Sequence, residues 1–328
     1  MERRSSHFGS GYSLVNQSLK RKFSFSTNRI VEEESSEGSG LGQEFDAMTF
    51  GEKIRHKMIH DHRVLLTEFA DKVAVKERVA QKIGREHVVP SVAVLDDPSE
   101  FNFVEYPREF VLKPSHGSQA GILFHTESAR HKSTWKPHDD IWGGYYDFHP
   151  SDLPVHIEFM REISNIWLKS KYRPGVEVCY EAIPPKLIIE KYLRPNPVGS
   201  MHDFRMYTFH GKVKFFRATS GLEDYTPAFA YDEFGLPLVI KAGHDNYDGH
   251  GPHPTLPAEW ATMKNMAEIL SEGVDFVRVD FYLIGHRIYF SELTNYPLSG
   301  TLTFTPDSFA KLVSSYWKYF DCCVAENS

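Results

Sequence analysis

One hairpin-like stretch decides the fold: Asp275-Phe-Val-Arg-Val-Asp-Phe-Tyr-Leu-Ile-Gly-His-Arg-Ile-Tyr-Phe-Ser-Glu-Leu293. Two runs rich in β-branched and aromatic residues flank a glycine-containing turn, which predicts two antiparallel strands. Alternation along a strand puts Arg278 and Asp280 on the same face. The returning strand brings Glu292 beside Asp280. The hairpin is therefore expected to present two carboxylates and a guanidinium together.

These acids are followed by the polar residues Thr294 and Asn295. Carboxylate and amide oxygens suit a hard cation such as Mg²⁺. The alternative is a surface hairpin whose charges are solvated. Flanking apolar residues, among them Phe276 and Phe290, favour a half-buried sheet, in which acids without partners are costly.

A second polar segment lies between two apolar runs, Glu109–Lys113 and Gly121–Phe124. It reads Pro114-Ser-His-Gly-Ser-Gln-Ala120 and predicts a hairpin with a polar tip. Backbone N–H groups and hydroxyls in such a loop can cradle phosphates while Lys113 supplies charge. The pattern matches neither the P-loop nor the dinucleotide-binding motif. A lysine that merely ends a strand is the alternative.

The remaining patterns predict hairpins interspersed with helices, and so an α+β fold rather than a doubly wound parallel sheet. A capping box at Thr49–Glu52 opens one helix. The other expected helices are 71–83 with Asp71 as N-cap and Gly84 as stop, Val155–Trp167, Pro257–Leu270 and Ser308–Phe320. The other expected strands are Val92–Leu95, Lys186–Leu193, Asp203–Phe209 and Lys212–Arg217, and residues 126–153 are expected to form a long loop.

The chain has 328 residues, 41% of them hydrophobic, which suffices for a sizeable core. Its formal charge of −7 argues against a general nucleic-acid binder. No run of about 18 uncharged apolar residues is present, so no membrane-spanning helix is expected. The three cysteines cannot build a disulfide framework and include no Cys-x-x-Cys pair. We therefore expect a reduced, cytoplasmic, globular protein, and oligomeric state is left open.

The first 46 residues are rich in Ser and Gly and show no apolar period, which predicts a flexible N-terminal tail. Their basic, acid-poor start also fits an organelle transit peptide. A disordered tail is the preferred interpretation.

Several motifs occur in a characteristic order along residues 48–305. They are Asp71-Lys72, Phe110-Val-Leu-Lys113 with its loop, Ile189-Glu-Lys-Tyr-Leu193, Asp203-Phe-Arg205, Arg278-Val-Asp280 and Phe290-Ser-Glu-Leu-Thr-Asn-Tyr-Pro-Leu-Ser-Gly300. This order resembles the ATP-grasp ligases, and most closely the TupA-like family. The resemblance implies an ATP-grasp fold, with the nucleotide held between two antiparallel-sheet subdomains. It divides residues 47–328 into an N-terminal segment (47–108), a small ATP-lid subdomain (109–193) and a metal-binding subdomain (194–328).

The resemblance also implies roles for individual residues. Lys72 and Lys113 would hold ATP phosphates from two sides, and the loop would close over the β- and γ-phosphates. The loop residues concerned are Ser115, His116, Gly117 and Ser118. The adenine pocket would be lined by Glu190, Lys191 and Leu193, largely through backbone groups.

On the other subdomain, the resemblance implies that Asp280 and Glu292 bind Mg²⁺ and that Arg278 stabilises charge developing on an acyl phosphate. The pair Asp203 and Arg205 matches an Asp-x-Arg motif of some relatives, and Arg217 is a further candidate for anion binding. In better-known members an Asn lies two residues after the metal-binding Glu. Here Thr294 occupies that position and Asn295 follows it, so Asn295 is expected as third ligand with Thr294 as the alternative.

The implied function is an ADP-forming carboxylate–amine ligase that uses ATP and Mg²⁺. A small-molecule carboxylate would attack the γ-phosphate, and an amine would displace phosphate from the acyl phosphate to give an amide or peptide bond, in polysaccharide or peptide-polymer biosynthesis. The alternatives are a small-molecule kinase on the same fold and a degenerate ATP-binding module.

Other features favour structural interpretations. The segment with His244, Asp245, Asp248, His250 and His253 is rich in Gly and Pro, so a polar loop is preferred to a metal site. Asp96-Asp97 precedes Pro98 in a predicted turn, and Cys179 is expected to be a core thiol. Two interpretations remain for Trp135, Trp142, Tyr145 and Tyr146, which could stack on a sugar or pack on one another.

Overall fold

The computed structural model describes residues 38–126, 141–194, 203–219, 228–243 and 253–319. The chain divides into two units at Leu41 and Gly42. Everything described below lies in the second unit unless stated otherwise.

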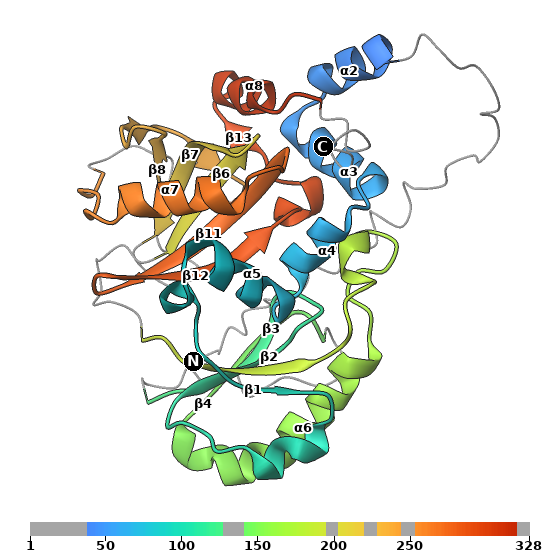
Figure 1. The fold of residues 1–328 in the computed structure, drawn as a ribbon, viewed down its shortest axis with the longest axis vertical. Coiled ribbons are helices and arrows are strands. Elements are labelled where there is room, and N and C mark those ends of the chain that lie inside the picture. The colour runs from blue at the N-terminus through green and yellow to red at the C-terminus, as the bar shows by residue number, and fades with distance from the viewer. Residues whose placement is uncertain (1–37, 127–140, 195–202, 220–227, 244–252, 320–328) are drawn as a thin grey trace, which may run out of the picture. The chain divides into compact units, whose positions relative to one another are not determined.

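Two sheets carry the fold (Figure 1). The five-stranded sheet has the order β1 (Ser91–Leu95), β5 (Leu187–Lys191), β2 (Phe110–Pro114), β3 (Ala120–Phe124), β4 (Gly144–Phe148). The six-stranded sheet has the order β12 (Arg287–Thr294), β11 (Phe276–Ile284), β6 (Asp203–Phe209), β7 (Lys212–Thr219), β8 (Ala228–Asp232), β9 (Pro237–Leu238). A short ladder joins β10 (Lys241–Ala242) to β13 (Phe304–Thr305). All pairs are antiparallel except β3 with β4, within the described ranges.

Helices accompany both sheets, which confirms the predicted α+β class. They are α2 (Gly38–Ala47), α3 (Phe50–His60), α4 (Val64–Ala70), α5 (Ala74–Ile83), α6 (Leu153–Lys169), α7 (Trp260–Leu270) and α8 (Asp307–Tyr316). Short 3-10 turns are η1 (Arg85–His87), η2 (Pro98–Phe103), η3 (Pro150–Asp152), η4 (Val178–Tyr180) and η5 (Pro297–Gly300). None of the helices in the described residues is both long and apolar enough to cross a membrane.

The helix starts follow the local sequence with shifts of a few residues; the helix predicted from Pro257, for example, begins at Trp260. The capping box at Thr49 and Glu52 is confirmed, since each residue's side chain binds the other's backbone N–H. The helix predicted to open at Asp71 begins instead at Ala74. Asp71 closes α4, and its carboxylate accepts a hydrogen bond from the Val73 N–H at 2.8 Å.

Two other predictions need correction. Residues 126–153 are not one long loop, because β4 pairs in parallel with β3 within that range; a five-residue strand is too short for its sequence period to reveal it. The predicted tail 1–46 overlaps α2, where Phe45 is buried against Trp317 at 5.8 Å between ring centroids. Residues 1–37 lie outside the described residues.

The helix α6 covers one face of the five-stranded sheet (Figure 1). Met160, Ile163 and Trp167 recur at helical spacing and are almost completely buried there. The Trp167 indole N–H donates to the Ile141 carbonyl at 2.8 Å. The predicted helix Val155–Trp167 is thereby confirmed, and it gives this sheet its own core.

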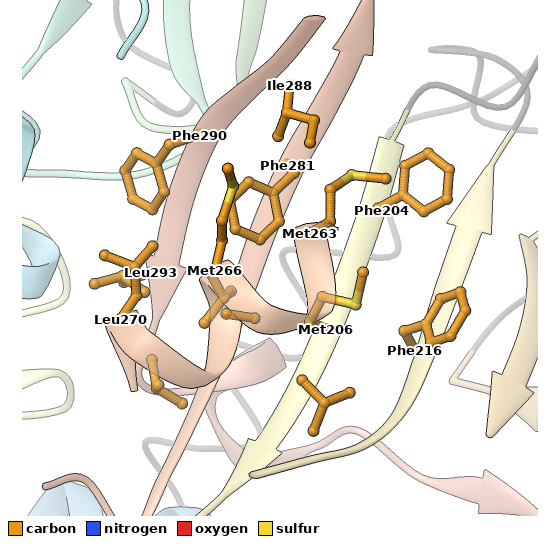
Figure 2. Close-up of a cluster of buried hydrophobic side chains, with 14 of the residues drawn as sticks. Phe204, Met206, Phe216, Met263, Met266, Leu270, Phe281, Ile288, Phe290 and Leu293 are labelled. Atoms are coloured by element: carbon orange, nitrogen blue, oxygen red, sulfur yellow. The ribbon is translucent and has the colours of Figure 1, made fainter. Parts of the chain in front are cut away.

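On the six-stranded sheet, α7 packs against one face. Figure 2 shows Met263, Met266 and Leu270 of α7 gathered over Met206 of β6 and Phe281 of β11. All five side chains are buried. The odd-numbered residues of β11 therefore face an apolar layer; they are Val277, Val279, Phe281 and Leu283.

The opposite face of the same sheet is apolar at one end and charged at the other. At the apolar end Phe276 packs on Trp317 with ring centroids 4.9 Å apart, and Phe50 of α3 contacts Phe276 at 5.1 Å. Because side chains alternate along β11, Arg278 and Asp280 lie on the same face as Phe276. The helices cover the apolar end, and the functional candidates occupy the other.

Candidate active site

The charged end of this face contains the predicted carboxylate pair. Asp280 of β11 lies opposite Glu292 of β12 in the ladder. Arg278 binds both acids: Nε lies 2.8 Å from Asp280 Oδ1, and Nη2 lies 2.5 Å from Asp280 Oδ2 and 2.8 Å from Glu292 Oε1. The structure therefore brings together the three residues that the hairpin pattern paired.

A second Arg–Asp pair lies on the neighbouring strand. Arg205 of β6 is in register with Asp280, and it donates to Asp203 Oδ2 through Nη2 at 2.7 Å and Nε at 3.1 Å. Arg217 of β7 is buried and lies in register with Arg205. Carboxylates and guanidinium groups thus lie together on three adjacent strands.

This packing of charge shifts the acid equilibria in opposite directions. Burial raises the pKa of Asp280 to about 7; Arg278 opposes this rise, while Glu292 and Asp203 add to it. The pKa of Glu292 is lowered: burial opposes the shift, but Arg278, the Thr294 hydroxyl and the charges of Lys72 and Arg205 favour the carboxylate. A further cation beside Asp280 would relieve the repulsion among the three carboxylates.

The five-stranded sheet contributes an ion-pair triad around the buried Glu190. Glu190 of β5 accepts from Lys113 of β2 at 3.0 Å and from Lys76 of α5 at 2.5 Å. Although burial opposes the shift, the two ammonium groups lower the pKa of Glu190 to about 2. The pKa of Lys113 is raised, chiefly because Glu190 overcomes the cost of burial. Lys113 therefore carries a permanent charge.

Lys72 connects the two charged groups. It lies in the turn between α4 and α5, and its Nζ donates to the Gly117 carbonyl. Burial, assisted by the charge of Lys113, lowers the pKa of Lys72 to about 8, while Glu292 and Glu190 oppose that shift. Carboxylates of both sheets thus act on one ammonium group.

Two tyrosines experience charges from the opposite sheet in the same way. Burial raises the pKa of Tyr282 on β11 to about 12, and the charge of Lys113 opposes the rise. Burial also raises the pKa of Tyr145 on β4, where Glu292 adds to the effect. The charged faces of the two sheets therefore belong to one electrostatic site.

Two side chains of the predicted phosphate loop point into the protein. Ser115 and His116 are buried, with Ser115 Oγ 3.2 Å from the Pro184 carbonyl and His116 Nε2 3.0 Å from the Trp167 carbonyl. Their side chains thus anchor the loop to the protein instead of facing the site. Gly117 lies directly beneath the Trp142 indole, since a Cβ there would fall 2.2 Å from the ring.

The tip of this loop and the end of β5 complete the predicted nucleotide residues. Ser118 is half-buried at the tip of the loop. The Glu190 side chain is engaged by the two lysines, and its backbone lies in the ladders of β5 with β1 and β2. Lys191 is exposed and Leu193 half-buried at the end of β5.

Asn295 is not brought to the carboxylates. Its amide nitrogen donates to the Leu66 carbonyl at 2.8 Å and lies 3.8 Å from Cys179 Sγ, in the buried interior. The Thr294 hydroxyl lies 2.9 Å from Glu292 Oε1 instead. Of the two candidate third ligands, the geometry favours Thr294.

The carboxylates fit a divalent cation that is held partly by substrate. Within the described ranges no group of three His, Cys, Asp or Glu side chains converges to bind a metal. Mg²⁺ commonly takes one or two carboxylates and completes its shell with water and phosphate oxygens. Asp280 and Glu292 match that donor set.

Sequence reasoning did not single out Lys76 and Tyr282. Both carry a periodic signal: Lys76 lies one helical turn after Lys72, and Tyr282 continues the alternation of Arg278 and Asp280.

The remaining candidates take structural roles where they can be described. Asp97 caps η2, as the predicted turn implies, and Cys179 is a buried free thiol. Trp142 packs edge-on against Tyr172 at 5.4 Å. Trp135, Cys322, Cys323 and residues 244–252 with their histidines and aspartates lie outside the described residues.

One protein-family model matches most of the chain. The model of the family described as TupA-like ATPgrasp matches residues 52–318. No curated protein sequence matches the chain.

Similar solved structures include three ligases. The D-alanine–D-alanine ligase from Bacillus anthracis complexed with ATP is 14% identical, with a TM-score of 0.36 over 70% of this chain and 56% of that one. The corresponding ligase from Helicobacter pylori is 11% identical (TM-score 0.38, 77% and 62%). The ATP-grasp ligase PsnB complexed with its minimal precursor is 12% identical (TM-score 0.35, 76% and 61%).

The chain thus aligns with less than two thirds of each of these structures. The family model, by contrast, spans most of the present sequence. The chain belongs to the TupA-like ATP-grasp family.

Proposed function

We propose that the protein is an ADP-forming carboxylate–amine ligase that makes an amide or peptide bond. The observation that carries this proposal is the position of Lys72. Its ammonium group is bonded to the Gly117 carbonyl of the predicted phosphate loop and experiences the charges of Glu190 and Glu292 from the two sheets. A triphosphate in that position would meet cations from one sheet and a carboxylate pair from the other.

Binding of ATP would use both lysines. Lys113 is held as a cation by Glu190, and the charge of Lys113 also acts on Lys72. Asp280 and Glu292 would hold Mg²⁺, which when bound neutralises phosphate oxygens and makes the γ-phosphorus more electrophilic. Gly117 and its neighbours would offer backbone N–H groups to the phosphates.

In the proposed reaction a substrate carboxylate attacks the γ-phosphorus, and ADP leaves. Arg278 lies beside the carboxylate pair, where its guanidinium would stabilise negative charge on the transferred phosphoryl group. Arg205 would add a second cation from β6. An amine then attacks the acyl carbon, phosphate leaves, and the amide forms. The protein's main contribution is positioning and charge stabilisation.

The substrates are small molecules in this proposal, and a cytoplasmic location is part of it. Family resemblance alone points to polysaccharide or peptide-polymer biosynthesis.

Purified protein incubated with ATP, Mg²⁺ and pools of amino acids and carboxylic acids tests the function. Amine-dependent ADP release with a new amide, identified by mass spectrometry, supports the ligase. A stable phosphorylated product would indicate a kinase. ATP binding without turnover would indicate a binding module.

A further inference from the structure

Arg173 lies between α6 and β5 and is oriented by residues far apart in sequence. Its Nη1 donates to the Ser299 hydroxyl and to Glu177 Oε1 at 3.2 Å, and Ser299 Oγ donates to the same Glu177 oxygen at 2.7 Å. Glu177 is 6% exposed, whereas the Arg173 side chain is 40% exposed. A buried carboxylate thus fixes one end of an accessible guanidinium.

The rest of this guanidinium is available. Nε and Nη2 of Arg173 make no hydrogen bond to any residue in the described part of the chain. These two groups form the edge of arginine that binds a carboxylate through two parallel hydrogen bonds. The fixed Nη1 lowers the conformational entropy that such binding would cost.

Ser299 reaches Arg173 from a strained turn. Leu298 and Ser299 both adopt left-handed backbone conformations, with φ of 48° and 49°. Two consecutive non-glycine residues in this region are unfavourable, and such strain concentrates at binding sites. The turn is braced by Arg55 Nη1, which donates to the Gly300 carbonyl at 2.5 Å.

An aromatic chain connects Arg173 with the predicted phosphate loop. The Arg173 guanidinium lies 5.5 Å from the Tyr172 ring centroid, and Tyr172 contacts Trp142 edge-on at 5.4 Å. Trp142 in turn lies directly over Gly117. The Arg173 group is therefore separated from the loop by two aromatic side chains.

The strand with Glu292 leads directly to Ser299, because β12 ends at Thr294 and the turn with Ser299 begins at Pro297. Burial raises the pKa of Tyr180, and the charges of both Glu177 and Glu292 raise it further. Tyr172 packs on Tyr180 at 4.8 Å and is affected by the same two carboxylates. One tyrosine pair is thus affected by two carboxylates, that of Glu177, which orients Arg173, and that of Glu292, a proposed metal ligand.

We propose that Arg173 binds the carboxylate of an amino acid that serves as the amine substrate. A carboxylate whose two oxygens both accept hydrogen bonds from an arginine is a poor nucleophile. The carboxylate bound by Arg173 is therefore not the one that attacks ATP, and the attacking carboxylate would bind beside Arg278. A substrate that offers an amine for the reaction and a second, unreactive carboxylate for recognition is an amino acid. The assignment of the ligand as a substrate rests on the proposed ligase function.

Binding to the full chain tests the proposal without turnover. Each of the common L- and D-amino acids and its α-carboxamide is titrated by ligand-observed NMR with Mg²⁺ and a non-hydrolysable ATP analogue. We expect at least one amino acid to bind, and amidation to weaken it about 10- to 100-fold. Arg173→Gln should weaken binding of the amino acid by the same factor, and amidation of the ligand should cause no further loss in this variant.

Matched variants separate recognition from folding. Lys171→Gln removes the same charge from the same exposed connection and should bind like the wild type. Arg173→Lys keeps the charge without the fork and should recover part of the affinity. Ser299→Ala removes the hydroxyl that binds Arg173 Nη1, so it should weaken binding of the amino acid and leave binding of its carboxamide unchanged. Thermal unfolding is recorded for every variant.

The proposal is overturned if no amino acid binds, if acid and carboxamide bind wild type equally, or if Arg173→Gln binds the acid like wild type. The two proposals fail separately. Amino-acid binding that depends on Arg173, without any amide product, would refute the ligase function but support the amino-acid site. Amide formation with an unchanged amino-acid KM in Arg173→Gln would refute the site and leave the ligase.

Discussion

Asp280 and Glu292 face each other across β11 and β12, and one arginine serves both carboxylates. Even with this arginine beside it, burial raises the pKa of Asp280 to about 7, and the charges of Glu292 and Asp203 add to the rise. A divalent cation would restore the balance. This relationship is the basis for assigning the pair to metal binding.

Neutral isosteres should therefore abolish Mg²⁺-dependent turnover. Asp280→Asn and Glu292→Gln keep size and shape but remove the charge that would hold the cation. We expect a fall in kcat/KM for ATP of at least about 100-fold for each variant, measured by ADP release over a range of Mg²⁺ concentrations.

Glu233→Gln is the matched control, because Glu233 pairs with Lys214 on the same sheet at 3.1 Å, away from the carboxylate pair. It should retain wild-type turnover. Normal Mg²⁺-dependent activity in both Asp280→Asn and Glu292→Gln would show that the metal site is wrongly assigned.

The second prediction concerns pH. The pKa of Lys72 is lowered to about 8 by burial and by Lys113. Its charge is present below that pH and is lost as the pH rises through it. ATP affinity should therefore weaken between about pH 7 and 9, by up to about tenfold for the loss of one charge-assisted contact. Isothermal titration with a non-hydrolysable analogue in the presence of Mg²⁺ measures this.

Lys72→Arg should flatten that pH dependence, whatever its effect on absolute affinity, because arginine remains charged throughout the range. Lys113→Arg should leave the profile unchanged, because the pKa of Lys113 is raised and it does not titrate there. An alkaline fall that persists in Lys72→Arg would assign the titration to another group.

Local sequence patterns predicted the parts of the site that strand geometry alone determines. Alternation places Arg278 and Asp280 together, and a short turn returns Glu292 opposite them. Asn295 follows the end of β12, and its amide nitrogen donates to the Leu66 carbonyl in the interior instead. The family's ligand position corresponds to Thr294, the next residue is the asparagine expected as ligand, and the geometry favours Thr294.

Contacts between distant segments were beyond local patterns. Lys76 reaches Glu190 across more than a hundred residues, and nothing in either segment indicates the pair. The inward orientation of Ser115 and His116 depends on two carbonyl groups, that of Pro184 before β5 and that of Trp167 in α6. The strand β4 likewise owes its existence to pairing with β3, because strand propensity depends on context.

The third prediction tests the loop. A Cβ on Gly117 would fall 2.2 Å from the Trp142 ring, so Gly117→Ala must displace the indole or the loop. An ångström-scale displacement of a phosphate-binding loop should reduce kcat/KM for ATP by about 10- to 100-fold. Steady-state ADP release measures the effect.

Trp142→Ala removes the clash, so adding Gly117→Ala to it should cost much less than in the wild-type background. Gly42→Ala is the control glycine, with its nearest neighbour 4.0 Å from the new Cβ, and should be silent. Equal effects of Gly117→Ala in both backgrounds would mean that the indole contact is irrelevant to the loop.

The last prediction concerns the buried charges beneath the site's sheet. Asp275, at the start of β11, accepts from Lys57 of α3, from Arg63 at 3.1 Å and from the Trp317 indole N–H at 3.0 Å. Lys57 and Asp275 are only 2% and 6% exposed. Asp275→Asn would leave two buried cations with Asp61 as their remaining acid. We expect a loss of about 3–5 kcal/mol in the free energy of unfolding, measured in urea.

Lys57→Met in the same chain should recover part of that loss, because it removes one of the two cations that Asp275→Asn leaves without a partner. Glu272→Gln breaks the exposed pair with Lys82, which lies 3.2 Å away, and should cost less than about 1 kcal/mol. The argument fails if Asp275→Asn is no more destabilising than Glu272→Gln. It also fails if the two core substitutions are additive, since additivity would mean that Lys57 and Asp275 do not stabilise each other.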